Sequence, residues 1–334
     1  MKVLICGGAG YIGSHIVREF TSYPSYEIII LDNFSKGHLE SIPESIKYEK
    51  GDICDKESLD KIFEKHRPNA VMHFCASIEV GESVENPLKY YENNVVGTIY
   101  LLQTMKKYDV KYFIFSSTAA IFGNPEFTPI PDDAKTLPIN PYGDTKLTVE
   151  KILDWSEKAD GIKYVCLRYF NACGAHESGE IGEDHDPESH LIPLILQVAL
   201  GRREQIKIFG NDYDTRDGTC IRDYIHVTDL ATAHIKALEY LVKENQSQKF
   251  NLGSGEGYSV KEVIEAARKV TNHPIPAKVE SRRPGDPAIL IAGSERAEKI
   301  LGWKRKYTTI EKIVETAWKF HQNHPHGYSS TAKK

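Results

Sequence analysis

The sequence lacks the features that mark secreted, membrane-bound and nucleic-acid-binding proteins. Its six cysteines are scattered through 334 residues, without the paired spacing of a disulfide framework or a thiolate metal site. The formal net charge is −5, so basic residues indicate neither a nucleic-acid partner nor an anionic membrane. The most apolar stretch, 191–200, contains Pro193 and Gln197 and has about half the length of a membrane span. We therefore expect a cytoplasmic protein with reduced, mostly buried thiols.

Internal repeats, low-complexity segments and a long apolar run near the first residue are also missing. The first apolar run, at 3–6, stops at Gly7 and is too short for the core of a signal peptide. Hydrophobic residues make up 40% and charged residues 27%, as in ordinary soluble globular proteins. The length allows two domains or one large α/β unit, and residues 329–334 look like a frayed tail.

Short apolar runs alternate with helical patterns through the first half of the chain. The predicted strands lie at 2–6, 27–31, 46–50, 70–74, 111–117 and 163–170. Several of these runs are almost continuously apolar, which is typical of strands buried on both faces of a parallel sheet. Between them, apolar residues recur at helical spacing, as from 88 to 102, where Asn86 and Pro87 predict the cap and first residue of a helix. This alternation predicts a doubly wound α/β sheet, and the looser pattern after about residue 171 predicts a smaller second domain.

A glycine-rich loop follows the first predicted strand, where residues 7–13 read GGAGYIG. Gly7, Gly10 and Gly13 would let backbone N–H groups approach a pyrophosphate at the N-terminus of the next helix, where the helix dipole favours negative charge. Asp32 ends the next strand, nineteen residues after Gly13. A carboxylate there accepts hydrogen bonds from an adenosine ribose and repels a 2′-phosphate, which favours NAD over NADP. The alternative is a structural turn that binds nothing.

A tyrosine and a lysine lie four residues apart in the stretch PYGDTK, at 141–146. Asn140 can cap a helix there, and Pro141 suits its first position. Tyr142 and Lys146 would then share one helix face, close enough to interact. The chain has eighteen tyrosines and many lysines, so this pair taken alone could be a surface accident. The rest of the chain must decide between the two interpretations.

Three motifs together resemble the extended short-chain dehydrogenase/reductase superfamily: the glycine spacing, FSST at 115–118 and the tyrosine–lysine pair. Five further stretches resemble the UDP-glucose 4-epimerases, namely LDN at 31–33, YYENN at 90–94, RYFN at 168–171, GTCIRDYIHV at 218–227 and RRPGD at 282–286. The resemblance runs in order from residue 2 to about residue 328. It implies an isomerase that interconverts UDP-galactose and UDP-glucose through a transient 4-keto intermediate, with tightly bound NAD.

The resemblance also implies an organisation. It places a Rossmann-type NAD-binding domain at 1–170 and a smaller C-terminal α/β domain for the UDP-hexose at 171–334. Segments near 215–250 could pack back on the first domain. The family suggests a homodimer, in which the long helices that start near 86 and 140 form a bundle.

Residue roles follow from the same resemblance. Tyr142 matches the catalytic acid/base, Lys146 its partner, and Thr118 the hydroxyl that bonds the sugar 4-OH. The cofactor positions are Gly7, Gly10, Tyr11, Ile12, Gly13, Asp32, Asn33, Asp52, Ile53, Phe74, Cys75, Ala76, Asn93, Tyr142, Lys146, Tyr169 and Phe170. The UDP-sugar positions are Thr118, Asn171, His190, Leu191, Lys207, Phe209, Arg222, Tyr224, Arg283, Asp286 and Leu290.

The implied chemistry explains the tyrosine–lysine pair. Inverting C4 of a hexose removes a hydride from carbon, which NAD can hold, and a proton from O4, which needs a base. A free tyrosine has a pKa of about 10, and both Lys146 and the positive nicotinamide ring would stabilise its phenolate. A lowering by about three pKa units corresponds to roughly 4 kcal/mol. Thr118 can orient the 4-OH or satisfy the backbone at the strand end, and Arg222 and Arg283 suit a pyrophosphate.

Several positions leave their roles open. Asp286 either binds the UDP-sugar or forms a plain surface ion pair with Arg283. His190 stands where many family members have asparagine, and Ile78 where some have lysine. Leu290 stands where members confined to unsubstituted sugars have tyrosine, so we expect UDP-N-acetylgalactosamine and UDP-N-acetylglucosamine to be accepted as well. The alternative is that Leu290 only packs in an apolar turn.

Competing functions and sites can be weighed from the same residues. Acidic residues and histidines at 183–190 match no recognised ligand spacing, so we expect an acidic loop and no metal. The nearest rival, a nucleotide-sugar 4,6-dehydratase, shares the fold, NAD and the tyrosine–lysine pair. Such enzymes carry Asp-Glu directly after the threonine, whereas Ala119 and Ala120 stand here and can move no protons. A binding or regulatory protein on this fold would often lose the tyrosine or the glycines, which this chain keeps.

Overall fold

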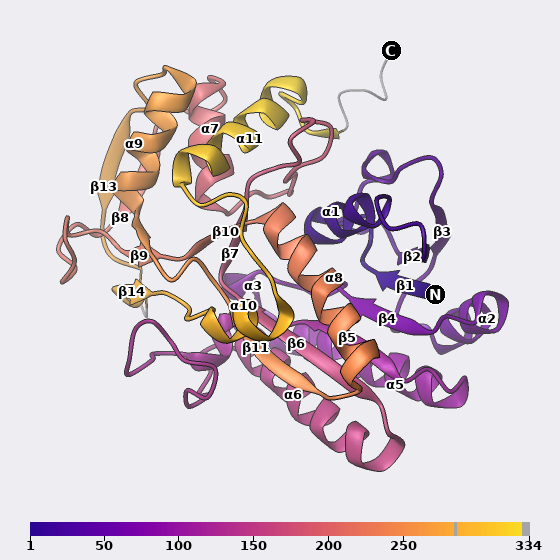
Figure 1. Ribbon diagram of the computed structural model, residues 1–334. Coiled ribbons are helices and arrows are strands. Elements are labelled where there is room, and N and C mark those ends of the chain that lie inside the picture. Colours follow the sequence, from indigo (N-terminus) through magenta and orange to yellow (C-terminus); the bar gives the residue numbers. More distant parts are fainter. Residues whose placement is uncertain (284–285, 329–334) are drawn as a thin grey trace.

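Seven parallel strands form the main sheet of the computed structural model, which describes residues 1–283 and 286–328 (Figure 1). Their order is β11-β6-β5-β4-β1-β2-β3. The strands are β1 (Lys2–Cys6), β2 (Glu27–Asp32), β3 (Lys47–Lys50), β4 (Ala70–His73), β5 (Tyr112–Ser116), β6 (Lys163–Tyr169) and β11 (Gln248–Leu252). The order reverses between β1 and β4, and doubly wound sheets bind their ligands outside the carboxyl ends of strands at such a point. The predicted fold class is confirmed.

All six strands predicted from the sequence are present, each within one residue of its predicted range. Leu4, Ile29, Val71, Phe113 and Val165 in their interiors have no exposed surface. A strand covered on both faces needs such a continuous apolar run, which is why the pattern predicts these strands well. Pro284, Gly285 and the predicted tail at 329–334 lie outside the described residues.

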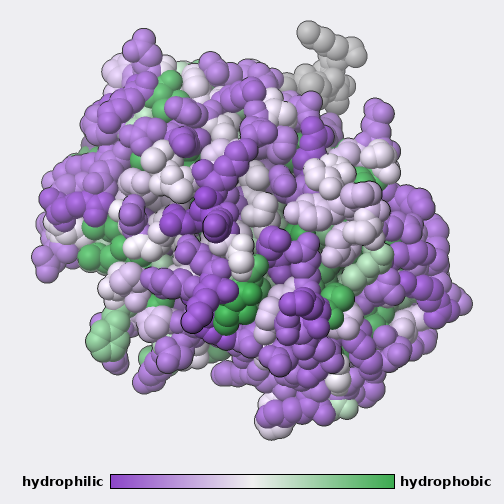
Figure 2. Space-filling view, viewed as in Figure 1, coloured by the Kyte–Doolittle hydropathy of each residue, from purple (hydrophilic) through white to green (hydrophobic). Residues whose placement is uncertain are grey.

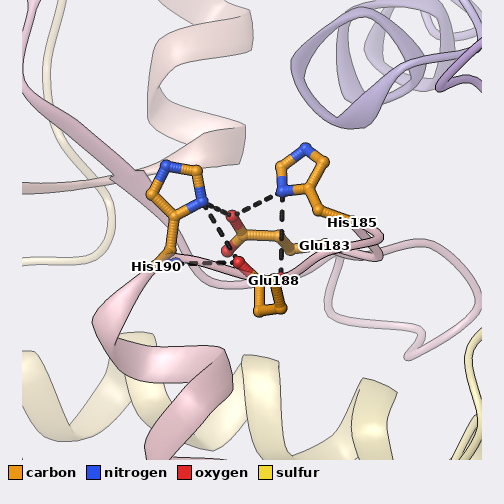
Figure 3. Close-up of side chains that lie close together, drawn as sticks. All are labelled: Glu183, His185, Glu188 and His190. Carbon is orange, nitrogen blue, oxygen red and sulfur yellow. Dashed lines mark hydrogen bonds and ion pairs between the residues drawn. The ribbon is translucent and has the colours of Figure 1, made fainter. Parts of the chain in front are cut away.

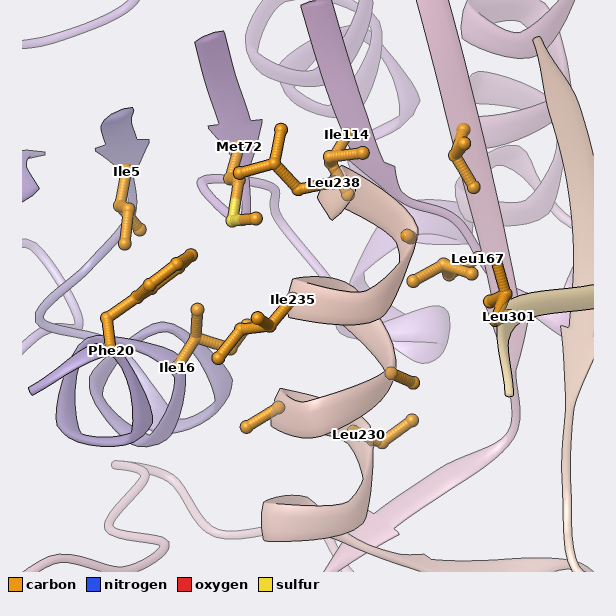
Figure 4. Packing of buried hydrophobic residues seen from close by; sticks show 14 of the residues in the cluster. Ile5, Ile16, Phe20, Met72, Ile114, Leu167, Leu230, Ile235, Leu238 and Leu301 are labelled. Atoms are coloured by element: carbon orange, nitrogen blue, oxygen red, sulfur yellow. The ribbon is translucent and has the colours of Figure 1, made fainter. Parts of the chain in front are cut away.

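Helices cover both faces of the sheet. One face carries α1 (Tyr11–Phe20) and α8 (Val227–Glu244), and the other carries α2 (Lys56–His66), α5 (Gly97–Lys107) and α6 (Pro141–Asp160). Figure 4 shows the first face, where Ile16 and Phe20 of α1 and Ile235 of α8 pack against Ile5 and Met72 of the sheet. Fully burying a side chain of this size contributes about 1.5–3 kcal/mol. This layer therefore fixes β1 and the glycine loop that follows it.

A second, smaller region lies beyond the carboxyl ends of the strands, at the upper left of Figure 1. Its strands form one parallel pair, β8–β13, and two small sheets, β10–β7 and β12–β9–β14. They are β7 (Asn171–Cys173), β8 (Ile206–Phe209), β9 (Ile221–Arg222), β10 (Tyr224–His226), β12 (Tyr258–Ser259), β13 (Ala277–Glu280) and β14 (Ile289–Leu290). Three helices, α7 (Leu191–Ala199), α9 (Val260–Thr271) and α11 (Ile310–Asn323), enclose an apolar core that includes Leu196, Val263 and Val314.

The chain passes between the two regions more than once. After β10, α8 returns to the sheet and β11 pairs with β6. The helix α10 (Glu295–Leu301) and Trp303 pack on the same side, where the indole Nε1–H donates to the Asp229 carbonyl at 2.9 Å. Segments from the second half of the sequence thus complete the first region. The division into domains at residue 170 remains a prediction.

The helix predicted to start at Asn86 differs from its prediction. Short helices α3 (Val80–Glu85) and α4 (Pro87–Tyr90) are followed by a π-helical turn, η2 (Tyr91–Val96), before α5 begins. Pro87 stands in the first turn as predicted, but the Asn86 side chain makes no capping hydrogen bond within the described part of the chain. A π turn is rare and often lies at a functional site. Here it contains Asn94, which is almost fully buried.

The surface is largely polar. The face in Figure 2 is mostly hydrophilic, and its hydrophobic side chains form small separate groups. Over residues 1–283 and 286–328, no helix combines the length and the apolar character needed to span a membrane. Exposed apolar side chains include Val84 of α3, Leu88 of α4 and Trp155 of α6.

Candidate active site

A cavity of about 970 Å³ lies where the carboxyl ends of the sheet strands face the smaller region. Every cofactor and substrate position predicted from the sequence lines this cavity. Gly7 and Asp32 come from the first strands, Tyr142 from α6, and Arg222 and Arg283 from the smaller region. The structure therefore brings these residues together at one site, while their individual roles stay predictions.

The glycine loop between β1 and α1 leaves no room for a side chain at Gly7 or Gly13. Gly7 has a φ of +82°, and a Cβ atom there would lie 2.7 Å from the Cys75 nitrogen. A Cβ atom on Gly13 would lie 2.1 Å from the Gly7 carbonyl oxygen. Gly10 directly precedes α1, so the first N–H groups of the helix face the cavity edge without a capping side chain between them and a ligand. Such a cradle fits a pyrophosphate.

Asp32 stands at the end of β2, as predicted, and is nearly buried. Its carboxylate accepts backbone N–H groups from Ala9 at 2.9 Å and Phe34 at 2.8 Å. Burial raises the pKa of Asp32, and these two hydrogen bonds oppose that rise. Next to it, the Asn33 amide donates to the Asp52 carboxylate at 2.8 Å. The carboxylate is thus held in place by the backbone of the loop that it faces.

Tyr142 and Lys146 lie in the first turns of α6. The Asn140 side chain caps this helix by accepting the Gly143 N–H at 2.9 Å, as predicted. The Lys146 ammonium donates to the Ser116 carbonyl at 2.9 Å and lies 5.9 Å from the centre of the Tyr142 ring. Its side chain is nearly buried, and burial lowers the pKa of Lys146 to about 8.

The pKa of Tyr142 moves against the expectation from the sequence. Burial raises it, and a hydrogen bond with Thr118 partly opposes the rise. Lys146 is not among the groups that lower the pKa in the protein alone. Thr118 also accepts the Ala120 N–H at 3.1 Å, which caps the short helix η3 (Ala119–Phe122). The backbone interpretation of this threonine is thus confirmed, and its role toward the sugar 4-OH stays a prediction, although its hydroxyl also faces the phenol.

A buried ion pair behind the site was missed from the sequence. Glu150 accepts the Ser117 hydroxyl at 2.7 Å and two Arg168 N–H groups at 2.9 and 2.6 Å. It thereby ties α6 to the ends of β5 and β6. The only sequence hint is spacing, because Tyr142, Lys146 and Glu150 recur at every fourth position of one helix.

Asn94 is a second residue that the sequence did not single out. Its side-chain oxygen accepts the Ser77 N–H at 2.8 Å, and its amide donates to the Ser77 carbonyl at 3.1 Å and the Thr145 hydroxyl at 3.1 Å. The π turn thus connects the loop after β4 to the start of α6. The neighbouring Asn93 donates to the Cys75 carbonyl at 3.3 Å. Both asparagines hold the cavity wall next to Tyr142.

The substrate side differs from one detail of the prediction. Asp286 pairs with Arg222 rather than with Arg283. The Arg283 guanidinium instead stacks over the Phe209 ring at 4.0 Å. Sequence adjacency suggested the wrong partner because β14 and β9 lie side by side in the fold, which brings Asp286 to Arg222. The two arginines still line the same cavity.

Other substrate positions have structural contacts as well. The Asn171 amide donates to the Asp223 carbonyl at 2.7 Å. Leu290 lines the cavity and packs against an apolar cluster that contains Ala119 and Ile121. Ile78 also lines the cavity and is 40% exposed. Both interpretations of Leu290 are thus compatible with its position.

The loop at 183–190 is more ordered than an acidic loop would be. Glu183, His185, Glu188 and His190 converge, and their ligand-type atoms all lie within 4.8 Å of one another (Figure 3). Burial lowers the pKa of His185, but the two nearby glutamate carboxylates outweigh burial and raise the pKa to about 9. His190 and Leu191 reach the cavity from the start of α7.

Comparisons with known proteins agree with this geometry. The chain matches the family described as GDP-mannose 4,6 dehydratase over residues 4–316. A curated UDP-glucose 4-epimerase from Halalkalibacterium halodurans is 56% identical over 333 residues, which cover 100% of this chain and 99% of that relative. A solved structure of a UDP-glucose 4-epimerase has a TM-score of 0.96 and 50% identity, with 98% of this chain and 99% of that chain covered. The UDP-glucose 4-epimerase of Brucella ovis, solved in complex with NAD, has a TM-score of 0.92 and 44% identity, with 95% and 97% covered.

Proposed function

The chain belongs to the UDP-glucose 4-epimerase family, and from that premise we propose which residues bind the cofactor, transfer the proton and bind the UDP-sugar. The protein is an isomerase of the extended short-chain dehydrogenase/reductase superfamily that interconverts UDP-galactose and UDP-glucose. Its cofactor is NAD. The single observation that carries the residue roles is that the glycine cradle, Tyr142 and the two arginines line one cavity.

The glycine loop and Asp32 hold the cofactor. The cradle at Gly7, Gly10 and Gly13 fits a pyrophosphate because a Cβ atom at its closest point would collide with backbone. Asp32, which lines the same cavity, would accept hydrogen bonds from the adenosine ribose of NAD. When bound, NAD supplies the capacity to take the C4 hydride and return it.

Tyr142 moves the proton of the sugar 4-OH. Its phenol must become phenolate near neutral pH, yet burial raises its pKa in the protein alone. Bound NAD would supply a positive nicotinamide ring, and this charge together with the Lys146 ammonium would stabilise the phenolate. Thr118 orients the 4-OH, and Ser116 holds the Lys146 ammonium in place through its carbonyl.

The nucleotide end of the substrate is gripped more firmly than the sugar. Arg222 and Arg283 suit the pyrophosphate, since guanidinium groups fork onto its oxygens. The sugar must turn over between the two halves of the reaction, so its surroundings need to be loose. Leu290 at the cavity wall lacks the bulk of a tyrosine, which supports turnover of N-acetylated UDP-sugars as well.

The chain lacks the acid and the base that a 4,6-dehydratase carries directly after the threonine. Ala119 and Ala120 follow Thr118 in the short helix η3 and carry no group that could remove water across C5–C6. The test is to record the absorbance of the purified protein before and after adding UDP-galactose, and to identify the product. We expect bound NAD, its transient reduction and UDP-glucose as the product. Steady accumulation of NADH or a stable 4-keto-6-deoxy sugar would contradict an epimerase.

Two copies of the chain form a homodimer in the cytoplasm. The proposal rests on exposed apolar side chains beside the long helices: Val84 is 62% exposed, Leu88 81% and Trp155 69%. Because α3 and α4 pack beside α6, a second copy could cover these side chains in one bundle. Light scattering of the wild type and of Leu88→Asp tests this. The wild type should have the mass of two chains and the variant a larger monomer fraction, whereas equal masses would contradict the proposed interface.

A further inference from the structure

Four potential metal ligands lie within one eight-residue segment, in the loop that leads into α7. The residues follow the pattern E-x-H-x-x-E-x-H, and we call them the 183–190 cluster: Glu183, His185, Glu188 and His190. Figure 3 shows that the two imidazoles approach the two carboxylates from opposite sides. His190 is also a predicted UDP-sugar position, and Glu183, His185 and His190 line the cavity, but the proton and hydride transfers described above use none of the four residues.

The distances in the cluster approach those of a tetrahedral site. The His190 Nδ1 atom lies 2.7 Å from a Glu183 oxygen and 3.4 Å from a Glu188 oxygen. The His185 Nδ1 atom lies 3.3 Å and 3.8 Å from oxygens of the same two residues. Four ligands about 2.0–2.2 Å from a central zinc ion would be roughly 3.3–3.6 Å apart. Three of the four nitrogen–oxygen distances lie near this spacing, and the 2.7 Å contact between His190 and Glu183 would have to lengthen when the ion binds.

The buried atoms of the cluster do not satisfy one another as hydrogen-bonding groups. Among the described residues, Glu183 Oε1, His185 Nδ1 and His190 Nδ1 are buried and have no hydrogen-bond partner of acceptable geometry. Glu183 is only 4% exposed, and a buried polar atom without a partner calls for an explanation. These ligand-type atoms converge within 4.8 Å of one another although they form no aligned N–H···O contacts. That is the arrangement expected around a central cation.

We propose that the 183–190 cluster binds one zinc ion. Imidazole and carboxylate donors suit zinc, whereas magnesium and calcium prefer oxygen ligands alone. Two carboxylates also balance the charge of a divalent ion. Four protein ligands leave no open position, which is the mark of a structural site rather than a catalytic one.

The surrounding contacts indicate what the ion would do. The Asp186 carbonyl in the same loop accepts from Lys36, and the Asp184 carbonyl lies 3.0 Å from His38 Nε2. Lys36 belongs to the loop after β2, close to the predicted ribose site, whereas His190 directly precedes α7 in the smaller region. Zinc at the cluster would therefore fix a loop that bridges the cofactor side and the substrate side of the cavity.

The first test measures zinc in the full-length, tag-free protein. After treatment with a chelator and dialysis against zinc chloride, elemental analysis should find about one zinc per chain. The melting temperature should rise by about 3 °C or more at saturating zinc, since the ion binds only the folded chain. Cobalt chloride in place of zinc should give the visible absorption of a four-coordinate N/O site. A zinc content near zero, or the absorption spectrum of six-coordinate hydrated cobalt, would overturn the proposal. The cluster would then consist only of ion pairs between imidazoles and carboxylates.

Matched variants separate this site from adventitious binding. His185→Asn removes one ligand of the cluster, and His326→Asn removes an exposed histidine outside it. We expect the zinc content and the thermal shift to be lost in the first variant and kept in the second. If His185→Asn does not fold, Glu183→Gln replaces a ligand at nearly constant size, and the cobalt spectrum of the wild type remains a separate test. Equal zinc contents in wild type and His185→Asn would overturn the proposal.

Discussion

The two walls of the cavity are built in different ways. The wall on the cofactor side is made largely of backbone: glycines 7–13 are packed so tightly that a Cβ atom on Gly13 would lie 2.1 Å from a carbonyl oxygen. The wall on the substrate side is made of long side chains, with Arg222 paired to Asp286 and Arg283 stacked on Phe209. A cavity wall made of tightly packed backbone is rigid and fits one ligand shape, whereas long side chains can change rotamer and fit more than one. This difference suits an enzyme whose cofactor stays bound while its sugar turns over.

The largest effect is expected on the backbone wall. Gly13→Ala forces a methyl group against the Gly7 carbonyl, so the loop must shift and the affinity for NAD should fall about a hundredfold. Gly81→Ala is the matched control, because a Cβ atom there has nothing within 4 Å. The NAD content of each purified variant checks the prediction. Equal NAD contents in the two variants would show that the tight packing of the loop does not matter for cofactor binding.

A pH experiment probes Lys146, where the two walls meet. Burial lowers the pKa of Lys146 from 10.5 to about 8, so between these values only the unfolded chain keeps this proton. The unfolded state then binds more protons, and the contribution of Lys146 to the free energy of unfolding should rise with pH by about 3 kcal/mol across the window. Urea unfolding of NAD-free wild type and Lys146→Met at several pH values measures it. A difference between the two proteins that stays constant with pH would contradict the lowered pKa.

On the substrate wall, two adjacent arginines offer a direct comparison. Arg283 lines the cavity, whereas Arg282 pairs with Asp212 and stacks on Tyr213 outside it. Arg283→Ala should raise the KM for UDP-sugars by about 10- to 100-fold, because a charge-assisted hydrogen bond is worth about 1.5–3 kcal/mol. Arg282→Ala should change the KM by less than about twofold. The NAD content should stay constant in both variants. A loss of NAD in Arg283→Ala would contradict the assignment of Arg283 to substrate binding alone.

The smallest change expected concerns the sugar itself. Leu290→Tyr should lower kcat/KM for the N-acetylated pair by about tenfold and leave the UDP-glucose/UDP-galactose pair nearly unchanged, because added bulk acts only where the acetamido group turns. The measurement compares both sugar pairs in wild type and variant. Equal loss on both pairs, or no activity of the wild type on acetylated sugars, would mean that Leu290 is not the gate.

The two walls also differ in what the sequence reveals about them. The glycine loop and Asp32 lie within a short stretch whose spacing itself implies the geometry, and the strands are continuous apolar runs. The Arg222–Asp286 pair, the buried Glu150–Arg168 pair and the 183–190 cluster depend on which distant segments or loop side chains meet in space. Spacing along the chain cannot show such meetings. The π turn that contains Asn94 was also missed, because the spacing of the apolar residues at 91–96 looks the same as in an α-helix.

The measurement that tests the central claim most directly is the kcat of Tyr142→Phe. The substitution removes only the phenolic hydroxyl, which faces Thr118 in the cavity where both walls meet. We expect kcat to fall by about 10²- to 10⁴-fold, the usual contribution of a general base, while NAD and UDP-sugar still bind. A variant that keeps more than about a tenth of the wild-type kcat would contradict Tyr142 as the principal base.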